Sequence, residues 1–220
     1  EYMRPVSKSG LGILRKIMPE EIACSEQALS PEIRRFAHKK ALLIITKTNA
    51  RATVHRAAHM EQVGIRVFDM DGNAVGEMRF HGLYTSTAYS GSSKEIPILR
   101  DKVAATLERA GFLPDSHSGK ALLHILETYP RDELFQISKS ELYRISVGIA
   151  ALQERRRVAL FTRHDAFQRF VSCLVYLPRD IFNTELCERI QKTLEESYKG
   201  EMTNYYSQVG DSALARLLFI

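Results

Sequence analysis

The stretch that decides the fold is residues 169–177, which read RFVSCLVYL. After its first residue it is almost continuously apolar, which is typical of a central strand buried on both faces. The loop 178–183 follows, and Asn183 at its end has the side chain of a helix N-cap. Two more strands are expected after the helix, at about 202–209 and 213–220. This order of strand, helix, strand and strand starts a ferredoxin-like βαββαβ unit, so it predicts an α+β fold.

The elements that flank this stretch extend the pattern. Apolar residues recur at helical spacing over 186–194, and Gly200 is expected to end that helix. A strand predicted at 157–162 can pair with 169–177 as a hairpin, in the place usually taken by the last strand of such a unit. The second helix of the unit would lie after Ile220, so we expect one face of the sheet to lack part of its cover. The chain also lacks an initial Met and stops within a predicted strand, which suggests a segment of a longer protein.

Helical periodicity dominates the middle of the chain. Three amphipathic helices are predicted there, over 97–110, over 118–129, and behind the capping box of Ser138 and Glu141. Gly111 stands where a cap should end the first of them. Together they form a helical connector between two groups of strands.

An antiparallel meander is predicted nearer the N-terminus. Its three strands are expected at about 41–48, 62–69 and 75–85. The pair Asp71-Gly72, which is preferred in tight hairpins, should join the last two. Residues 10–14 favour a short strand, and residues 19–22 favour the start of a short helix.

Composition limits the function classes. The chain has 220 residues, of which 45% are hydrophobic and 26% charged, so it is not expected to be disordered. No apolar run approaches the roughly 18 residues that span a bilayer, so we expect a water-soluble protein with no membrane partner. The three cysteines are too scattered for a disulfide framework and nothing resembles a signal peptide, so we expect a cytoplasmic protein. The net charge of +5 does not by itself call for a nucleic-acid partner.

One acidic motif has the spacing of a calcium loop but not its other requirements. Asp69, Asp71 and Asn73 stand at the first, third and fifth positions of such a loop. The sixth and twelfth positions need Gly and Glu, and this chain has Ala74 and Phe80 there. A hairpin turn is therefore the preferred explanation.

No other motif predicts catalysis, cofactor binding or a metal site. His55 and His59 are four residues apart, but no Glu lies between them and no further ligand follows at the right spacing. The run 10–12 lacks the third glycine of a dinucleotide fingerprint, and no Gly-x-Ser-x-Gly sequence occurs. The arginine run 155–157 could hold an anion, but an exposed strand edge or an inter-domain salt bridge is the preferred explanation.

The polar loop 178–183 is the best candidate for binding. It joins a buried strand to a capped helix, where free helix N–H groups and a fixed strand end converge. Its candidate residues, for an effector or an interface, are Arg179, Asp180 and Asn183. The alternative is that Asn183 only caps the helix and that Arg179 and Asp180 form ion pairs.

Four runs of sequence carry a resemblance to a known family. They are SGKALLHILETYPRDELFQ at 118–136, RFVSCLVYLPRD at 169–180, NTEL at 183–186 and GLYTS at 82–86. These runs closely resemble the N-terminal region of the large-type bacterial NAD-specific glutamate dehydrogenases, and the likeness covers nearly the whole chain from Ala41 onward. It implies a parent enzyme that oxidatively deaminates L-glutamate to 2-oxoglutarate and ammonia, with NAD as cofactor. It also implies that the catalytic and NAD-binding domains lie C-terminal to this region, so this segment should be inactive and bind no NAD.

The resemblance implies a domain plan as well, because the family's N-terminal region consists of ACT-like and PAS-type modules with helical connectors. We expect a PAS-like antiparallel β domain over 1–115, a helical connector over 116–154, and an ACT-like (ferredoxin-type) domain over 155–220, truncated at its C-terminus. The implied role is regulation and oligomerisation, with other domains and subunits of the same enzyme as partners. By fold-level analogy with ACT modules, a small amino-acid effector would bind at the candidate loop residues.

The competing hypothesis is a stand-alone α+β module that binds a ligand or RNA. A ferredoxin-like sheet with exposed aromatic residues can stack bases. Tyr205 and Tyr206 are adjacent in a predicted strand, so they face opposite sides and make a poor stacking platform. Binding of nucleic acid that weakens steeply with salt would separate the two hypotheses.

Overall fold

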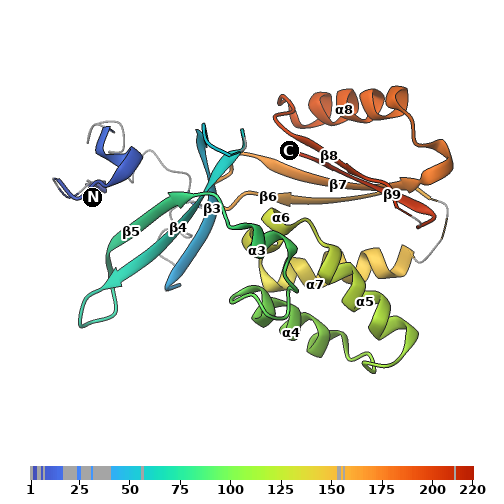
Figure 1. The fold of residues 1–220 in the computed structure, drawn as a ribbon, viewed down its shortest axis with the longest axis horizontal. Coiled ribbons are helices and arrows are strands. Elements are labelled where there is room, and N and C mark those ends of the chain that lie inside the picture. Colours follow the sequence, from blue (N-terminus) through green and yellow to red (C-terminus); the bar gives the residue numbers. More distant parts are fainter. Residues whose placement is uncertain are drawn as a thin grey trace. The chain divides into compact units, whose positions relative to one another are not determined.

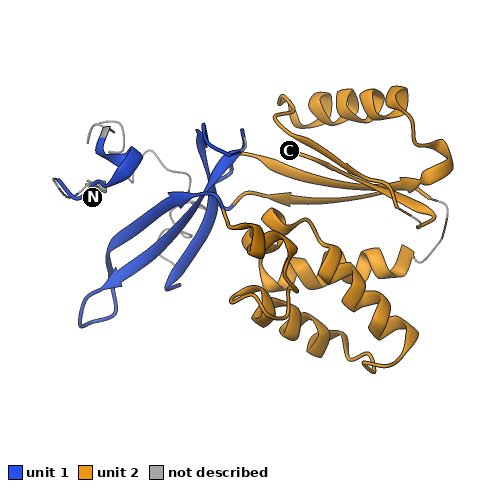
Figure 2. Ribbon diagram, in the orientation of Figure 1, with its two compact units in different colours: residues 1–83, 166–168 blue, residues 84–165, 169–220 orange. Residues whose placement is uncertain are grey.

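The computed structural model describes residues 2–3, 6, 8–16, 24–25, 31, 41–55, 57–152, 155, 157–210 and 212–220. The chain forms two compact units (Figure 2), which are described separately. Unit 1 consists of Glu1–Leu83 and Ala166–Gln168, and unit 2 consists of Tyr84–Asp165 and Arg169–Ile220. Among the described residues, no helix has the length and apolar character needed to span a bilayer.

A three-stranded antiparallel sheet is the main element of unit 1 (Figure 1). Its strands are β3 (Leu43–Arg51), β4 (His59–Phe68) and β5 (Ala74–Gly82), hydrogen-bonded in the order β3-β4-β5. Ile45, Val63 and Phe80 are aligned across the three strands, and β-branched and aromatic residues of this kind favour a pleated sheet. The predicted meander is therefore confirmed.

The turn between β4 and β5 uses its acidic residues to hold the backbone. The carboxylate of Asp69 accepts the N–H of Asn73 at 2.8 Å and that of Asp71 at 3.0 Å. The bond from Asn73 is the main reason that the pKa of Asp69 is lowered. Gly72 has a φ of +78°, which glycine adopts without strain. The hairpin explanation is confirmed, and among the residues that the structure describes no group of three or more His, Cys, Asp or Glu could hold a metal ion.

The N-terminal residues differ from the expectation. Short strands β1 (Tyr2–Met3) and β2 (Cys24–Ser25) pair antiparallel, and η1 (Gly12–Lys16) is a 3-10 helix. The strand predicted at 10–14 is therefore wrong. Gly12 takes a φ of +57°, a left-handed conformation that interrupts an extended chain and that glycine tolerates. The helix predicted from 19–22 lies outside the described residues.

Helices form the first half of unit 2. They are α3 (Ser86–Ser90), α4 (Leu99–Ala110), α5 (His117–Thr128), α6 (Arg131–Gln136) and α7 (Lys139–Leu152). The long helices α4, α5 and α7 confirm the three predicted ones. Two of the expected caps are also present: Gly111 takes a φ of +65° after α4, and Ser138 Oγ accepts the N–H of Glu141 at 3.2 Å before α7.

A four-stranded antiparallel sheet forms the second half of unit 2. Its strands are β6 (Ala159–His164), β7 (Val171–Pro178), β8 (Tyr205–Gln208) and β9 (Leu214–Phe219), in the order β6-β7-β9-β8, and α8 (Thr184–Tyr198) joins β7 to β8. The strand–helix–strand–strand order and the β6–β7 hairpin are confirmed. The end of α8 differs by one residue from the prediction at Gly200. Lys199 takes the left-handed conformation at φ +52°, because the N–H of Gly200 closes the last turn onto the carbonyl of Glu195.

Both faces of this sheet are covered. Helix α8 packs on one face, against the buried side chains of Cys173, Val175, Leu177, Ala215, Leu217 and Phe219. The helices α5–α7 lie against the opposite face (Figure 1). Leu174, Tyr176 and Leu218 are buried on this face, and Leu174 and Leu218 line a pocket together with Tyr129 and Ile145 of the helical part. On the face that carries α8, the β6 edge is less covered than the rest, because Leu160 there is 48% exposed. This is where we expected the sheet to lack part of its cover. The helices that precede β6 cover the second face.

Candidate functional site

The predicted loop residues are all exposed and lie between β7 and α8. They are Arg179 and Asp180, in the short 3-10 helix η3 (Arg179–Ile181), and Asn183. Asn183 Oδ1 accepts the N–H of Leu186 at 2.8 Å, so Asn183 is the N-cap of α8. Arg179 Nη1 donates to the carbonyl of Gly210 at 2.9 Å and thereby ties the loop to the β8–β9 turn. Effector binding by this loop stays a prediction.

A second polar site lies where the helices meet the sheet, and it was not predicted from the sequence. Arg163 on β6 donates to both carboxylate oxygens of Glu133 on α6, at 2.7 and 2.9 Å. The two side chains are only 5% and 4% exposed, and Ser172 Oγ lies 3.5 Å from the guanidinium. Burial alone would lower the pKa of Arg163, but the carboxylate of Glu133 outweighs it, and the pKa is raised. Arg163 therefore keeps its charge, and the two side chains form a charge-assisted, two-bond contact between the helices and the sheet.

Two sequence signals pointed to these residues without joining them. Glu133 directly precedes the apolar pair Leu134-Phe135, and Arg163 shares its strand face with Phe161. Arg163 is therefore a charge on a strand face that should be buried, and Glu133 stands next to residues that should be buried. Thirty residues separate the two, so neither signal identifies its partner.

Lys102 on α4 reaches the same neighbourhood. Its Nζ donates to the carbonyls of Leu134 at 3.0 Å and Phe135 at 2.7 Å, at the C-terminal end of α6, where a cation is favourable. Burial, together with the nearby cations Arg163 and Lys139, lowers the pKa of Lys102 from 10.5 to about 8. The α6 C-terminus is thus bonded by a Lys102 side chain that releases its proton near pH 8.

We expect the free energy of unfolding to rise between about pH 8 and pH 10.5 relative to a Lys102→Met variant. The folded chain releases the Lys102 proton near pH 8, whereas the unfolded chain keeps it to about 10.5. The stabilisation that comes from the lowered pKa of Lys102 is therefore complete above about pH 10.5 and is lost as the pH falls through 8. The free energy of unfolding differs by about 1–3 kcal/mol between these two limits. Urea unfolding of both proteins over this range measures the difference, and parallel pH profiles would contradict the lowered pKa.

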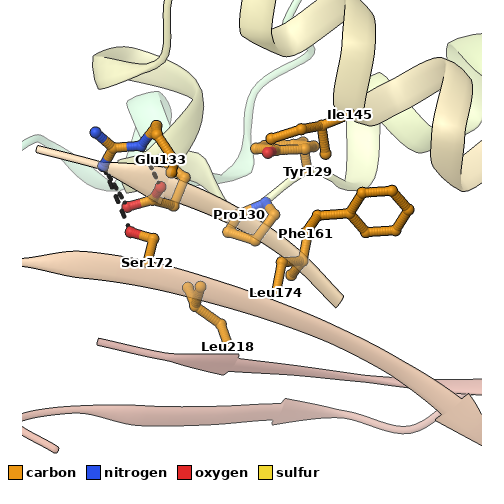
Figure 3. A pocket seen from close by; sticks show the side chains of 9 residues that line it. Tyr129, Pro130, Glu133, Ile145, Phe161, Ser172, Leu174 and Leu218 are labelled. Atoms are coloured by element: carbon orange, nitrogen blue, oxygen red, sulfur yellow. Dashed lines mark hydrogen bonds and ion pairs between the residues drawn. The ribbon is translucent and has the colours of Figure 1, made fainter. Parts of the chain in front are cut away.

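The pocket beside the ion pair is too small for an amino acid. Its other walls are Tyr129, Pro130, Ile145, Phe161, Leu174 and Leu218, and its volume is about 10 Å³ (Figure 3). A water molecule needs roughly 10–15 Å³, whereas pockets for organic ligands measure roughly 300 Å³ or more. We therefore describe this site as a joint between the helices and the sheet rather than as a ligand cavity.

The remaining sequence motifs have structural explanations. NAD, the cofactor that the resemblance implies for the parent enzyme, does not fit the described residues at 10–12, because this run leads into η1 and not into an α-helix that follows a strand. His59 Nδ1 lies 3.2 Å from the carbonyl oxygen of Thr48, so a backbone group faces this ring nitrogen. In the run 155–157 the first and last residues are exposed, and the middle one lies outside the described part of the chain.

The adjacent tyrosines of β8 face opposite sides of the sheet. Tyr205 aligns with Phe219, with ring centroids 5.1 Å apart, and its hydroxyl lies 3.4 Å from Cys187 Sγ. Tyr206 aligns with Leu218, which belongs to the other face. The two rings therefore do not form one stacking surface, as the sequence predicted.

Two family models match the parts of unit 2 described above. Residues 96–155, which contain α4–α7, match "Glutamate dehydrogenase, helical motif 1". Residues 159–220, which contain β6–β9 and α8, match "Glutamate dehydrogenase, ACT2 domain". The chain belongs to the glutamate dehydrogenase family. The predicted ACT-like domain is therefore confirmed, and the helices before it are a glutamate dehydrogenase helical motif.

Three curated relatives, each named NAD-specific glutamate dehydrogenase, match this glutamate dehydrogenase chain. The protein of Halomonas elongata is 40% identical over 215 residues, which is 98% of this chain and 13% of the relative. Those of Pseudomonas aeruginosa and Mycobacterium tuberculosis are 38% and 31% identical, each over 84% of this chain and 11% of the relative. The chain thus spans about an eighth of the length of the relatives it matches. The resemblance to the large NAD-specific glutamate dehydrogenases is confirmed.

Proposed function

We propose that this chain is a non-catalytic regulatory and oligomer-building segment of an NAD-dependent glutamate dehydrogenase. The parent enzyme oxidatively deaminates L-glutamate to 2-oxoglutarate and ammonia, with NAD as hydride acceptor. The observation that carries the proposal is the match of residues 96–155 and 159–220 to a helical motif and an ACT2 domain of that enzyme. The geometry supports it, because the buried charges Glu133 and Arg163 bind each other in a joint that has no room for a substrate.

We keep the three-domain plan within this proposal. The sheet of β3–β5 represents the PAS-like β domain of the range 1–115, whereas α4 from the same range matches the helical motif together with the connector 116–154. An ACT-like domain occupies 155–220. The antiparallel sheet of β3–β5 supports the PAS-like assignment. We propose that the ACT-like domain is completed by a further helix, as in a full ferredoxin-like unit.

The partners follow from the same proposal. The segment works in the cytoplasm, contacts other domains and subunits of its enzyme, and binds neither NAD nor nucleic acid. The placement of Tyr205 and Tyr206 on opposite sheet faces argues against a base-stacking surface. A small amino acid is the proposed effector, at the loop of Arg179, Asp180 and Asn183.

Free amino acids at millimolar concentration are expected to raise the Tm of the chain. A ligand at about ten times its Kd stabilises the folded state by about 1.4 kcal/mol, which is a shift of a few degrees. Arg179→Ala, which removes the bond to Gly210, should abolish the shift, whereas Lys192→Ala on the exposed surface of α8 should keep it. If no amino acid moves the Tm of the unchanged chain, this loop is not an effector site.

Deletion of the corresponding segment from the full-length Halomonas elongata relative tests the proposed role. We expect the shortened enzyme to retain glutamate-dependent reduction of NAD when it stays folded, and to lose its native oligomeric state or its response to amino acids. Light scattering measures the first property, and initial rates with and without added amino acids measure the second. A shortened enzyme that keeps its assembly and its response but loses turnover would show that the segment is catalytic.

A further inference from the structure

Helix α6 is short and is bounded by extended residues at both ends. Tyr129 (ψ 141°) and Pro130 (ψ 119°) separate it from α5, and Ile137 (ψ 141°) separates it from α7. Helical hydrogen bonding does not continue through residues in this conformation. Rotation about these residues would therefore move α6 as one rigid piece.

One side of α6 holds the segment with which unit 2 begins, residues 84–91. The hydroxyl of Tyr89 donates to Asp132 Oδ1 at 2.6 Å. The rings of Tyr84 and Phe135 stack with their centroids 4.1 Å apart. An ordered hydrogen bond and an aromatic stack thus fix this segment to α6.

The next residue of α6 faces a different element. Glu133 is bound by Arg163 of β6 through two hydrogen bonds, at 2.7 and 2.9 Å. Successive residues of an α-helix point about 100° apart, so the partners of Asp132 and Glu133 lie in different directions from the helix axis. A rotation of α6 therefore changes both contacts together.

We infer that α6 pivots as a rigid helix and thereby couples the position of β6 to the position of residues 84–91. A displacement of β6 moves Glu133 through its bidentate pair, turns α6 about its extended flanking residues, and displaces Asp132 with its bound Tyr89. Thermodynamic coupling of this kind is reciprocal, so loosening either contact loosens the other. All of these contacts lie within unit 2, and the coupling requires neither an effector nor the proposed function.

Amide hydrogen exchange of the full chain, resolved into short peptides, tests the coupling through α6. Glu133→Gln keeps the side-chain size but removes the charge that binds Arg163. We expect exchange in residues 84–91 to become at least about threefold faster relative to the amides of α8, which report general loss of stability. Tyr89→Phe removes a single hydroxyl, and we expect it to speed exchange in β6 by a similar factor.

Arg216→Gln is the matched control. Arg216 Nη1 on β9 donates to the carbonyl of Thr128 at 2.6 Å, so this bond also joins the sheet to the helices, but at the last residue of α5 and not at a residue of α6. Its loss should leave exchange in residues 84–91 unchanged relative to α8. Equal acceleration by Arg216→Gln, or no response of β6 to Tyr89→Phe, would overturn the inference. The Tyr89 variant decides alone if Glu133→Gln fails to fold.

Discussion

Replacement of Glu133 by alanine is expected to lower the free energy of unfolding of unit 2 by about 3–5 kcal/mol. The variant leaves the guanidinium of Arg163, whose side chain is 5% exposed, buried without its carboxylate. An arginine cannot escape this cost by losing its proton, because its pKa is too high. Urea denaturation followed by circular dichroism measures the change.

An exposed ion pair of the same helical motif provides the control. Asp101 lies 3.7 Å from Arg100, and the two side chains are 66% and 59% exposed. Asp101→Ala should cost less than about 1 kcal/mol, because solvent screens such a pair. The double replacement of Glu133 and Arg163 by methionine should recover much of the loss, since it leaves no unpaired charge. A cost below about 1 kcal/mol for Glu133→Ala would contradict the buried joint.

Leu174→Asp is expected to prevent stable folding of unit 2. Leu174 is 4% exposed on the sheet face that the helical motif covers, and it lines the pocket of Figure 3. An aspartate there buries a carboxylate among apolar side chains, which costs more than about 4 kcal/mol or forces the two layers apart. Loss of the cooperative unfolding transition, together with binding of a dye specific for exposed apolar surface, is the expected result.

Leu160→Asp is the control for this prediction. Leu160 lies on the neighbouring strand but is 48% exposed, on the opposite face of the sheet. Its replacement should cost less than about 1 kcal/mol in this chain, because the new carboxylate stays hydrated. Equal effects of the two substitutions would mean that the helical motif does not cover the second face.

The regular elements of the fold could be predicted because their hydrophobic periods are long enough to read. Helices α4, α5 and α7 each run for at least 12 residues, and β7 is a nearly unbroken apolar strand. Helix α6 was not predicted, because six residues do not complete two turns. The layer that covers Leu174 and Leu218 was missed as well, because a period shows that a face is buried but not which distant element buries it.

The candidate site was predicted only in part for the same reason. The capping role of Asn183 was foreseen because an N-cap is a local pattern. The bond from Arg179 to Gly210 and the pair of Glu133 with Arg163 join residues 31 and 30 positions apart, so no local pattern contains them. The contacts of α6 with Tyr89 and Arg163 also join distant residues, so the sequence period of α6 does not contain them.

We propose that this chain regulates and assembles a dehydrogenase whose reacting groups lie elsewhere in the longer protein. The most direct measurement is the formation of NADH by the purified chain in the presence of L-glutamate and NAD, beside the full-length Halomonas elongata relative as positive control. We expect that the chain forms no NADH above the blank while the relative does. NADH formation that increases in proportion to the concentration of the chain would contradict it.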